Sequence, residues 1–79
     1  MINEYEYKKY YEHVDYVERE GLKLITTLRE IATEEHWPDI VHKSVRKLGL
    51  WAYRKGLLTE EEKNLLMYEW PKYFSWKEP

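Results

Sequence analysis

The feature of this sequence that most constrains its fold is an apolar stripe that keeps one phase from Tyr7 to Ile31. Its members follow one another at alternating steps of three and four residues, a spacing that places them on one face of a helix. Further residues widen that face by one position. The stripe consists of Tyr7, Tyr10, Val14, Val17, Gly21, Leu24, Leu28 and Ile31, with Tyr11, Ile25 and Ala32 beside them.

The stripe predicts one long helix over residues 4–35. Asn3 is a suitable N-cap, and Glu4 and Glu6 place negative charge where the helix dipole favours it. Gly21 costs a helix about 1 kcal/mol relative to alanine, so two helices broken at Gly21 are the alternative. The stripe keeps its phase across Gly21 and no capping residue lies within two positions, which favours one helix, straight or bent. A glycine on this face would also let an aromatic ring approach closely.

A second helix is predicted over residues 38–55. Trp37-Pro38 ends the first helix, because the residue before a proline is pushed out of the helical region while proline suits a first turn. Gly56 suits the left-handed position that follows a last turn. We expect no new cap near Ser44, so this segment is a poor candidate for a helix-turn-helix.

A third helix is predicted over residues 60–70. Thr59 and Glu62 have the spacing of a capping box, in which each side chain accepts the other residue's backbone N–H. Pro71 removes a backbone donor and is expected to end or kink the helix. An aromatic tail follows it.

The sequence therefore predicts one all-α domain over residues 1–79, a small three-helix domain with a long N-terminal helix and an aromatic C-terminal tail. A chain of 79 residues without cysteine has no disulfide or thiolate metal site, so its stability must come from packing or self-association. The predicted core consists of Leu24, Ile25, Leu28, Ile31, Val41, Val45, Leu48, Leu65 and Leu66.

The first helix is longer than the domain it belongs to. About 30 residues make a rod of about 45 Å, whereas a compact domain of this size is about 30 Å across. The amino-terminal half of the stripe then lacks cover from its own chain. We expect a homodimer in which this patch meets itself across a two-fold axis. The predicted dimer seam consists of Tyr7, Tyr10, Tyr11, Val14 and Val17.

Charge is unevenly distributed along the chain, although its net value is only −2. Residues 1–37 hold five basic and nine acidic residues, residues 38–56 hold five and one, and residues 57–79 hold three and five. The basic second helix offers a nucleic-acid-binding hypothesis, with phosphate contacts from Lys43, Arg46, Lys47 and Arg54. The simpler interpretation is that this helix lies between the two acidic ones with its charges solvated, and the low pI favours that interpretation.

The aromatic tail is the second candidate contact surface. Tyr73, Phe74 and Trp76 would fill a partner's pocket if exposed, because Trp and Tyr are frequent interface hot spots. In the alternative they fold back over the core and fix the end of the third helix to the first.

Nothing in the sequence indicates catalysis, a cofactor or a metal. His13, His36 and His42 lack the four-residue spacing of a zinc pair, and there is no glycine-rich phosphate loop or nucleophile elbow. No run of 18 apolar residues is present, and the first residues lack the pattern of a secretory signal. We therefore expect a cytoplasmic protein that is not an enzyme.

These features favour a non-catalytic protein-binding protein that occludes a partner's surface. An inhibitor, an adaptor or a regulatory subunit of the size that phages and mobile elements often encode would fit. The alternative is a nucleic-acid-binding regulator that uses the basic second helix.

Overall fold

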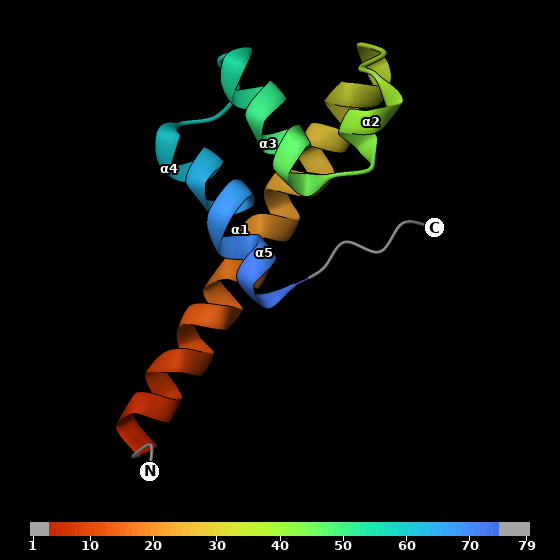
Figure 1. The fold of residues 1–79 in the computed structure, drawn as a ribbon. Coiled ribbons are helices and arrows are strands. Elements are labelled where there is room, and N and C mark those ends of the chain that lie inside the picture. The colour runs from red at the N-terminus through yellow and green to blue at the C-terminus, as the bar shows by residue number, and fades with distance from the viewer. Residues whose placement is uncertain (1–3, 75–79) are drawn as a thin grey trace.

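The computed structural model describes residues 4–74, which form helices and short connections without a strand. Helix α1 (Glu4–Glu34) is one unbroken rod, and the other helices gather around its second half (Figure 1). The molecule measures 48 × 28 × 16 Å along its principal axes because the first half of α1 projects beyond this body. The predicted all-α domain with a long N-terminal helix is confirmed. Among these residues, none of the helices carries the extended apolar stretch that spanning a bilayer requires.

Helix α1 runs through Gly21 because this residue is a contact point for an aromatic ring. Gly21 is buried, and the indole of Trp70 lies directly against it. A Cβ atom at Gly21 would lie 2.7 Å from Cζ3 of Trp70 and closer still to Cε3, where real Cβ atoms are essentially never found. The close approach expected of a glycine on the apolar face is therefore present, and its packing offsets the low helix propensity of glycine.

The end of α1 is fixed by backbone hydrogen bonds around His36. This residue has a positive φ of 55°, and the N–H of Trp37 donates to the carbonyl of Ala32 over 2.9 Å. This is the pattern of a Schellman cap. The indole N–H of Trp37 also donates to the Glu35 carboxylate over 2.8 Å, so the buried ring keeps its polar atom paired.

The predicted second helix is wrong as a single element. The structure contains α2 (Asp39–His42) and α3 (Val45–Arg54), separated at Lys43 and Ser44. Ser44 has an extended backbone and is the N-cap of α3, because its Oγ accepts the N–H of Lys47 over 3.3 Å. The expectation of no cap near Ser44 was therefore also wrong. Arg29 of α1 donates to the carbonyl of His42 and so satisfies the end of α2.

The predicted third helix continues past its expected end. Helix α4 (Glu60–Asn64) passes into a π-helix η1 (Leu65–Glu69) and then into α5 (Trp70–Tyr73). The capping box at the start is confirmed, with both reciprocal hydrogen bonds present. Pro71 does not end the helix. The wide π turn lies directly before it, where a regular turn would bring the proline ring against the carbonyl four residues back.

The core lies between the second half of α1 and the other helices. Of the nine predicted core residues six are buried, while Leu24, Ile31 and Leu65 are partly buried against the core. The sequence analysis did not place several further residues in this core. The buried apolar residues are Val17, Ile25, Leu28, Ala32, Trp37, Val41, Val45, Leu48, Ala52, Leu58, Leu66 and Trp70.

Candidate functional site

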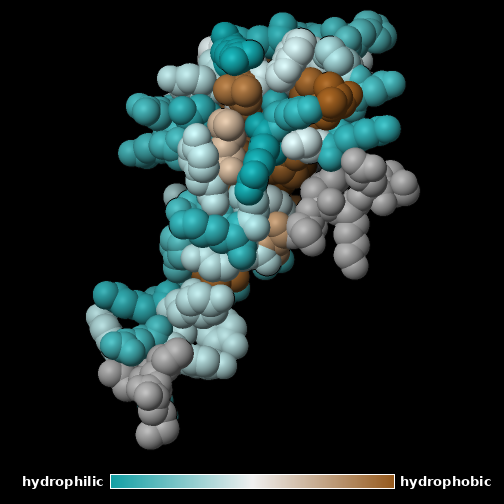
Figure 2. Space-filling model, in the orientation of Figure 1, coloured by the Kyte–Doolittle hydropathy of each residue, from teal (hydrophilic) through white to brown (hydrophobic). Residues whose placement is uncertain are grey.

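The projecting half of α1 carries an exposed surface that we call the tyrosine face, formed by Tyr7, Tyr10, Tyr11 and Val14. The three tyrosines are 52%, 54% and 49% exposed, and Val14 is half-buried. Figure 2 shows the outermost part of this stretch in teal and pale tones, without the brown that marks apolar residues in the body. Val17, predicted as part of the dimer seam, is fully buried in the chain's own core and is not accessible to a second copy.

The rings of the tyrosine face hold one another in place. Tyr7 and Tyr11 meet edge to face with centroids 4.7 Å apart, and their hydroxyl oxygens are 2.9 Å apart. Tyr10 contacts Tyr11 in the same manner at 5.8 Å. The hydrogen bond between the Tyr7 and Tyr11 hydroxyls and the proximity of the Tyr7 phenol raise the pKa of Tyr11 above its usual value of 10. The face combines apolar ring surface with hydroxyl groups, the character of many wet interfaces.

A polar cluster joins the base of the tyrosine face to the end of η1 and to α5. His13 lies 3.4 Å from a carboxylate oxygen of Glu69, and its ring meets Tyr73 with centroids 5.8 Å apart. Lys72 pairs with the same carboxylate over 3.2 Å. The hydrogen bonds from Lys72 and then His13 lower the pKa of Glu69. This cluster is where the projecting half of α1 meets the body.

The predicted aromatic contact residues lie at this same junction. Tyr73 and Phe74 are half-buried against the core. The ring centroid of Phe74 lies 4.5 Å from that of Trp70, and the ring centroid of Tyr73 lies 6.1 Å from that of Tyr10. Both rings thus follow the alternative in which the tail folds over the core, and their role in partner binding stays a prediction. Trp76 lies outside the described residues.

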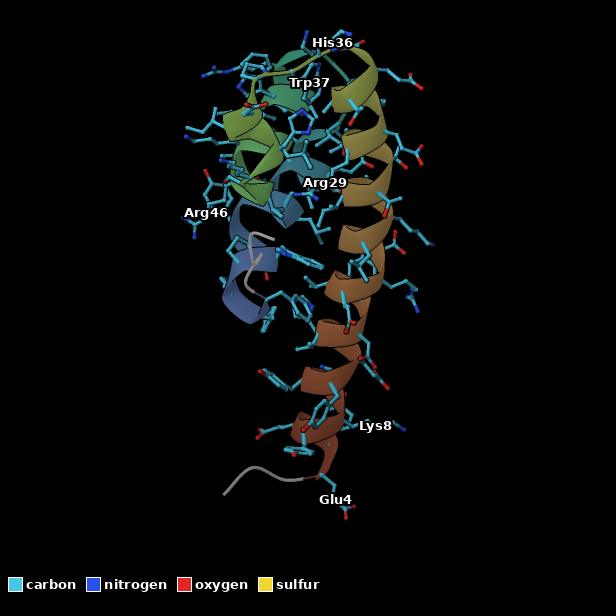
Figure 3. The ribbon with its side chains drawn as sticks, turned by 90° about the vertical axis from the view of Figure 1, so that its right-hand side faces the viewer. Glu4, Lys8, Arg29, His36, Trp37 and Arg46 are labelled. Atoms are coloured by element: carbon cyan, nitrogen blue, oxygen red, sulfur yellow. The ribbon has the colours of Figure 1, made fainter. Side chains whose placement is uncertain are left out.

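The four basic residues proposed for nucleic-acid binding are all exposed. Lys43 precedes α3, Arg46 and Lys47 lie in its first turn, and Arg54 lies in its last. None forms an ion pair with a carboxylate of residues 4–74, and Arg46 points away from the body (Figure 3). Lys55, which follows α3, lies 4.0 Å from Glu35, the residue after the end of α1.

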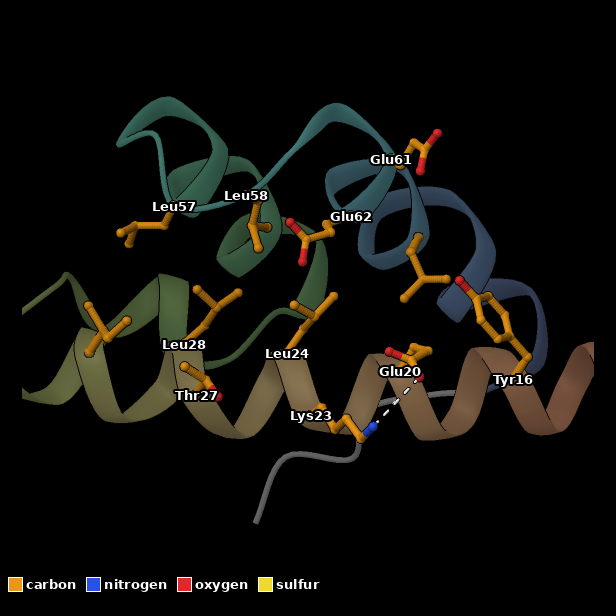
Figure 4. A pocket seen from close by; sticks show the side chains of 12 residues that line it. Tyr16, Glu20, Lys23, Leu24, Thr27, Leu28, Leu57, Leu58, Glu61 and Glu62 are labelled. Carbon is orange, nitrogen blue, oxygen red and sulfur yellow. Dashed lines mark ion pairs between the residues drawn. The ribbon is translucent and has the colours of Figure 1, made fainter.

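The sequence analysis missed a groove between α1 and the segment 57–65, which forms its opposite wall (Figure 4). It has a volume of about 360 Å³. Leu24 and Leu28 of α1 face Leu58 across it. The groove escaped sequence reasoning because its two walls are far apart in the sequence and its leucines have the spacing of ordinary core residues.

Among residues 4–74, no group of three or more His, Cys, Asp or Glu residues is placed to hold a metal ion. The chain matches no family model, no curated protein and no solved structure. Its function must therefore be argued from its own surfaces.

Proposed function

We propose that this chain is a non-catalytic protein-binding protein that acts as an inhibitor, adaptor or regulatory subunit by covering a surface of its partner. The tyrosine face is the observation that supports this most strongly. It places three half-exposed rings on a helix that projects beyond the body. Tyrosine is enriched in interfaces because it supplies large contact area with few rotatable bonds. Its contacts within the chain order the rings before binding, which lowers the entropy lost on association.

The same face also suits a second copy of the chain, and we propose a homodimer. A two-fold axis would place the tyrosine face of one protomer against the tyrosine face of the other. We further propose a cytoplasmic location, since a chain without cysteine does not depend on an oxidising compartment.

Partner capture from the native host tests the protein-binding function. The wild type and a Tyr7→Gln, Tyr11→Gln double variant would be used as bait, because glutamine keeps the helix and removes both rings. The control is Tyr68→Gln, which removes a tyrosine outside the tyrosine face that is 57% exposed. A protein that both the wild type and the control retain and the double variant loses would support the proposal. Recovery of the same proteins by all three baits would contradict it.

A second candidate is nucleic-acid binding by the exposed cations around α3. The observation that favours it is that Lys43, Arg46, Lys47 and Arg54 remain without carboxylate partners among the described residues. A mobility shift on random DNA or RNA that disappears between about 50 and 200 mM salt would support phosphate contacts. No shift at the lower salt concentration would remove this candidate.

A further inference from the structure

The groove between α1 and the segment 57–65 is a long apolar trough. On its α1 side it extends from Tyr16 to Ile31, a distance of about 22 Å along the helix. Leu28 and Leu58 form a buried floor, whereas Leu57 at the rim is 43% exposed. Four turns of a bound helix would match this length.

The charged groups that line the groove are predominantly acidic. Glu20, Glu61 and Glu62 contribute three carboxylates and Lys23 contributes one ammonium group, a net charge of −2. Glu20 is 3.7 Å from Lys23 and also 3.7 Å from Arg19, which lies outside the groove lining, and Glu62 accepts a backbone N–H at the start of α4. The side chain of Glu61 has no ion pair or hydrogen bond with any described residue, and its carboxylate points outward (Figure 4). The groove therefore complements a cationic partner.

The walls of the groove favour a helix over an extended peptide. Both walls are mainly helical, so most of their backbone N–H and C=O groups are already paired within helices. An extended peptide would find no sheet edge to pair with, whereas a helix satisfies its own backbone. Tyr16, Glu20, Leu24 and Leu28 also form a row at steps of four along α1, the kind of ridge that packs into the surface of another helix.

We propose that this groove binds a basic amphipathic helix of a partner protein. The apolar face of that helix lies on the leucines, and its flanking Lys or Arg residues lie beside Glu20 and Glu61. This inference rests on the proposed protein-binding function but concerns a surface separate from the tyrosine face.

Two synthetic helical peptides test the inference on the full chain labelled with ¹⁵N. They share leucines at positions i, i+3, i+4 and i+7 and differ only in flanking residues, which are all Lys or all Glu. We expect the Lys peptide to shift the amide resonances of Leu24, Thr27 and Leu58 and to bind about tenfold more tightly than the Glu peptide, since each exposed charge pair changes affinity a few-fold. Equal binding of the two peptides, or shifts confined to other surfaces, would overturn it.

Matched variants then locate the peptide. Thr27→Arg places a bulky cation in the groove, whereas Thr26→Arg places it on the neighbouring exposed position outside. We expect the first to abolish binding of the Lys peptide and the second to leave it within twofold of the wild type. Equal effects of the two variants would contradict binding in the groove.

The carboxylates have their own matched pair of double variants. Glu20→Gln with Glu61→Gln removes two charges from the groove, and Glu18→Gln with Glu60→Gln removes two from outside it. The first double variant should bind the Lys peptide several-fold more weakly than the wild type, and its binding should depend less on salt. Equal affinities of the two double variants for this peptide would count against the role of charge. The Tyr7→Gln, Tyr11→Gln variant should still bind the peptide. The proposal for the tyrosine face and the proposal for the groove can therefore be contradicted independently of each other.

Discussion

The two halves of α1 share one apolar stripe but differ in what covers it. In residues 17–34 the stripe is mainly aliphatic, and the other helices bury Val17, Ile25 and Leu28 almost completely. In residues 4–16 it is mainly tyrosine, and half of each ring on the tyrosine face remains exposed. Periodicity thus identified the face of the helix that avoids water. The type of side chain distinguishes the part that packs within the chain from the part that remains half-exposed to solvent.

The largest expected effect comes from removing a side chain in the packed half. Leu28→Ala deletes one of the largest fully buried side chains, so the free energy of unfolding should fall by about 3 kcal/mol, as large-to-small core substitutions do. Urea denaturation followed by circular dichroism measures it. A loss below about 1 kcal/mol would show that this half of α1 is not the core.

The next largest effect on stability is expected at Gly21, against which the indole of Trp70 packs. Gly21→Ala should raise helix propensity yet lower the free energy of unfolding by about 2 kcal/mol, because the added methyl group collides with the buried indole. Thr26→Ala, on the exposed side of the same helix, is the control and should change stability by less than about 0.5 kcal/mol. A more stable Gly21→Ala variant would contradict the close packing of α5 on α1.

The junction between the two halves should respond to acid. The pKa of Glu69 is lowered by Lys72 and His13, so its ionised form contributes stability above the ordinary carboxylate pKa. That contribution is lost as the pH falls through the lowered pKa. The wild type should therefore be more stable than Glu69→Gln at neutral pH, with the difference vanishing in acid. Denaturation midpoints of both proteins measured against pH test this, and a difference that grows in acid would refute the assigned sign.

The smallest effect on stability is expected in the projecting half. Tyr7→Gln with Tyr11→Gln removes two exposed rings, so under dilute conditions the free energy of unfolding should change by no more than about 0.5 kcal/mol per site. The same denaturation experiment at low protein concentration provides the value. A loss comparable with that of Leu28→Ala would mean that these rings belong to the fold and not to a contact surface.

Local signals predicted much of the fold. The phase of the stripe predicted the long α1, and the spacing of Thr59 and Glu62 predicted the start of α4. Ser44 was missed because the apolar spacing continues across the turn, while its capping role depends on an extended backbone at the end of α2. Pro71 was expected to end or kink the helix. The helix continues through it, because a π turn precedes it and Trp70 packs on Gly21. Rules based on local sequence do not predict such tertiary contacts.

The candidate sites were predicted less completely. The tyrosines could be named from the sequence because they share a helix face, and their exposure follows from the length of α1. The groove could not be predicted, since Leu24, Ile31 and Leu65 have the pattern of core residues. Only the folded chain shows that they are partly buried, with Leu24 and Leu65 on opposite walls.

Sedimentation equilibrium tests most directly whether the projecting half of α1 is a protein contact surface. At tens of micromolar the wild type should sediment with twice the mass of the chain. The Tyr7→Gln, Tyr11→Gln variant should sediment as a single chain with unchanged helix content. A wild type that remains a single chain throughout this range, or a double variant that still forms dimers, would contradict the account.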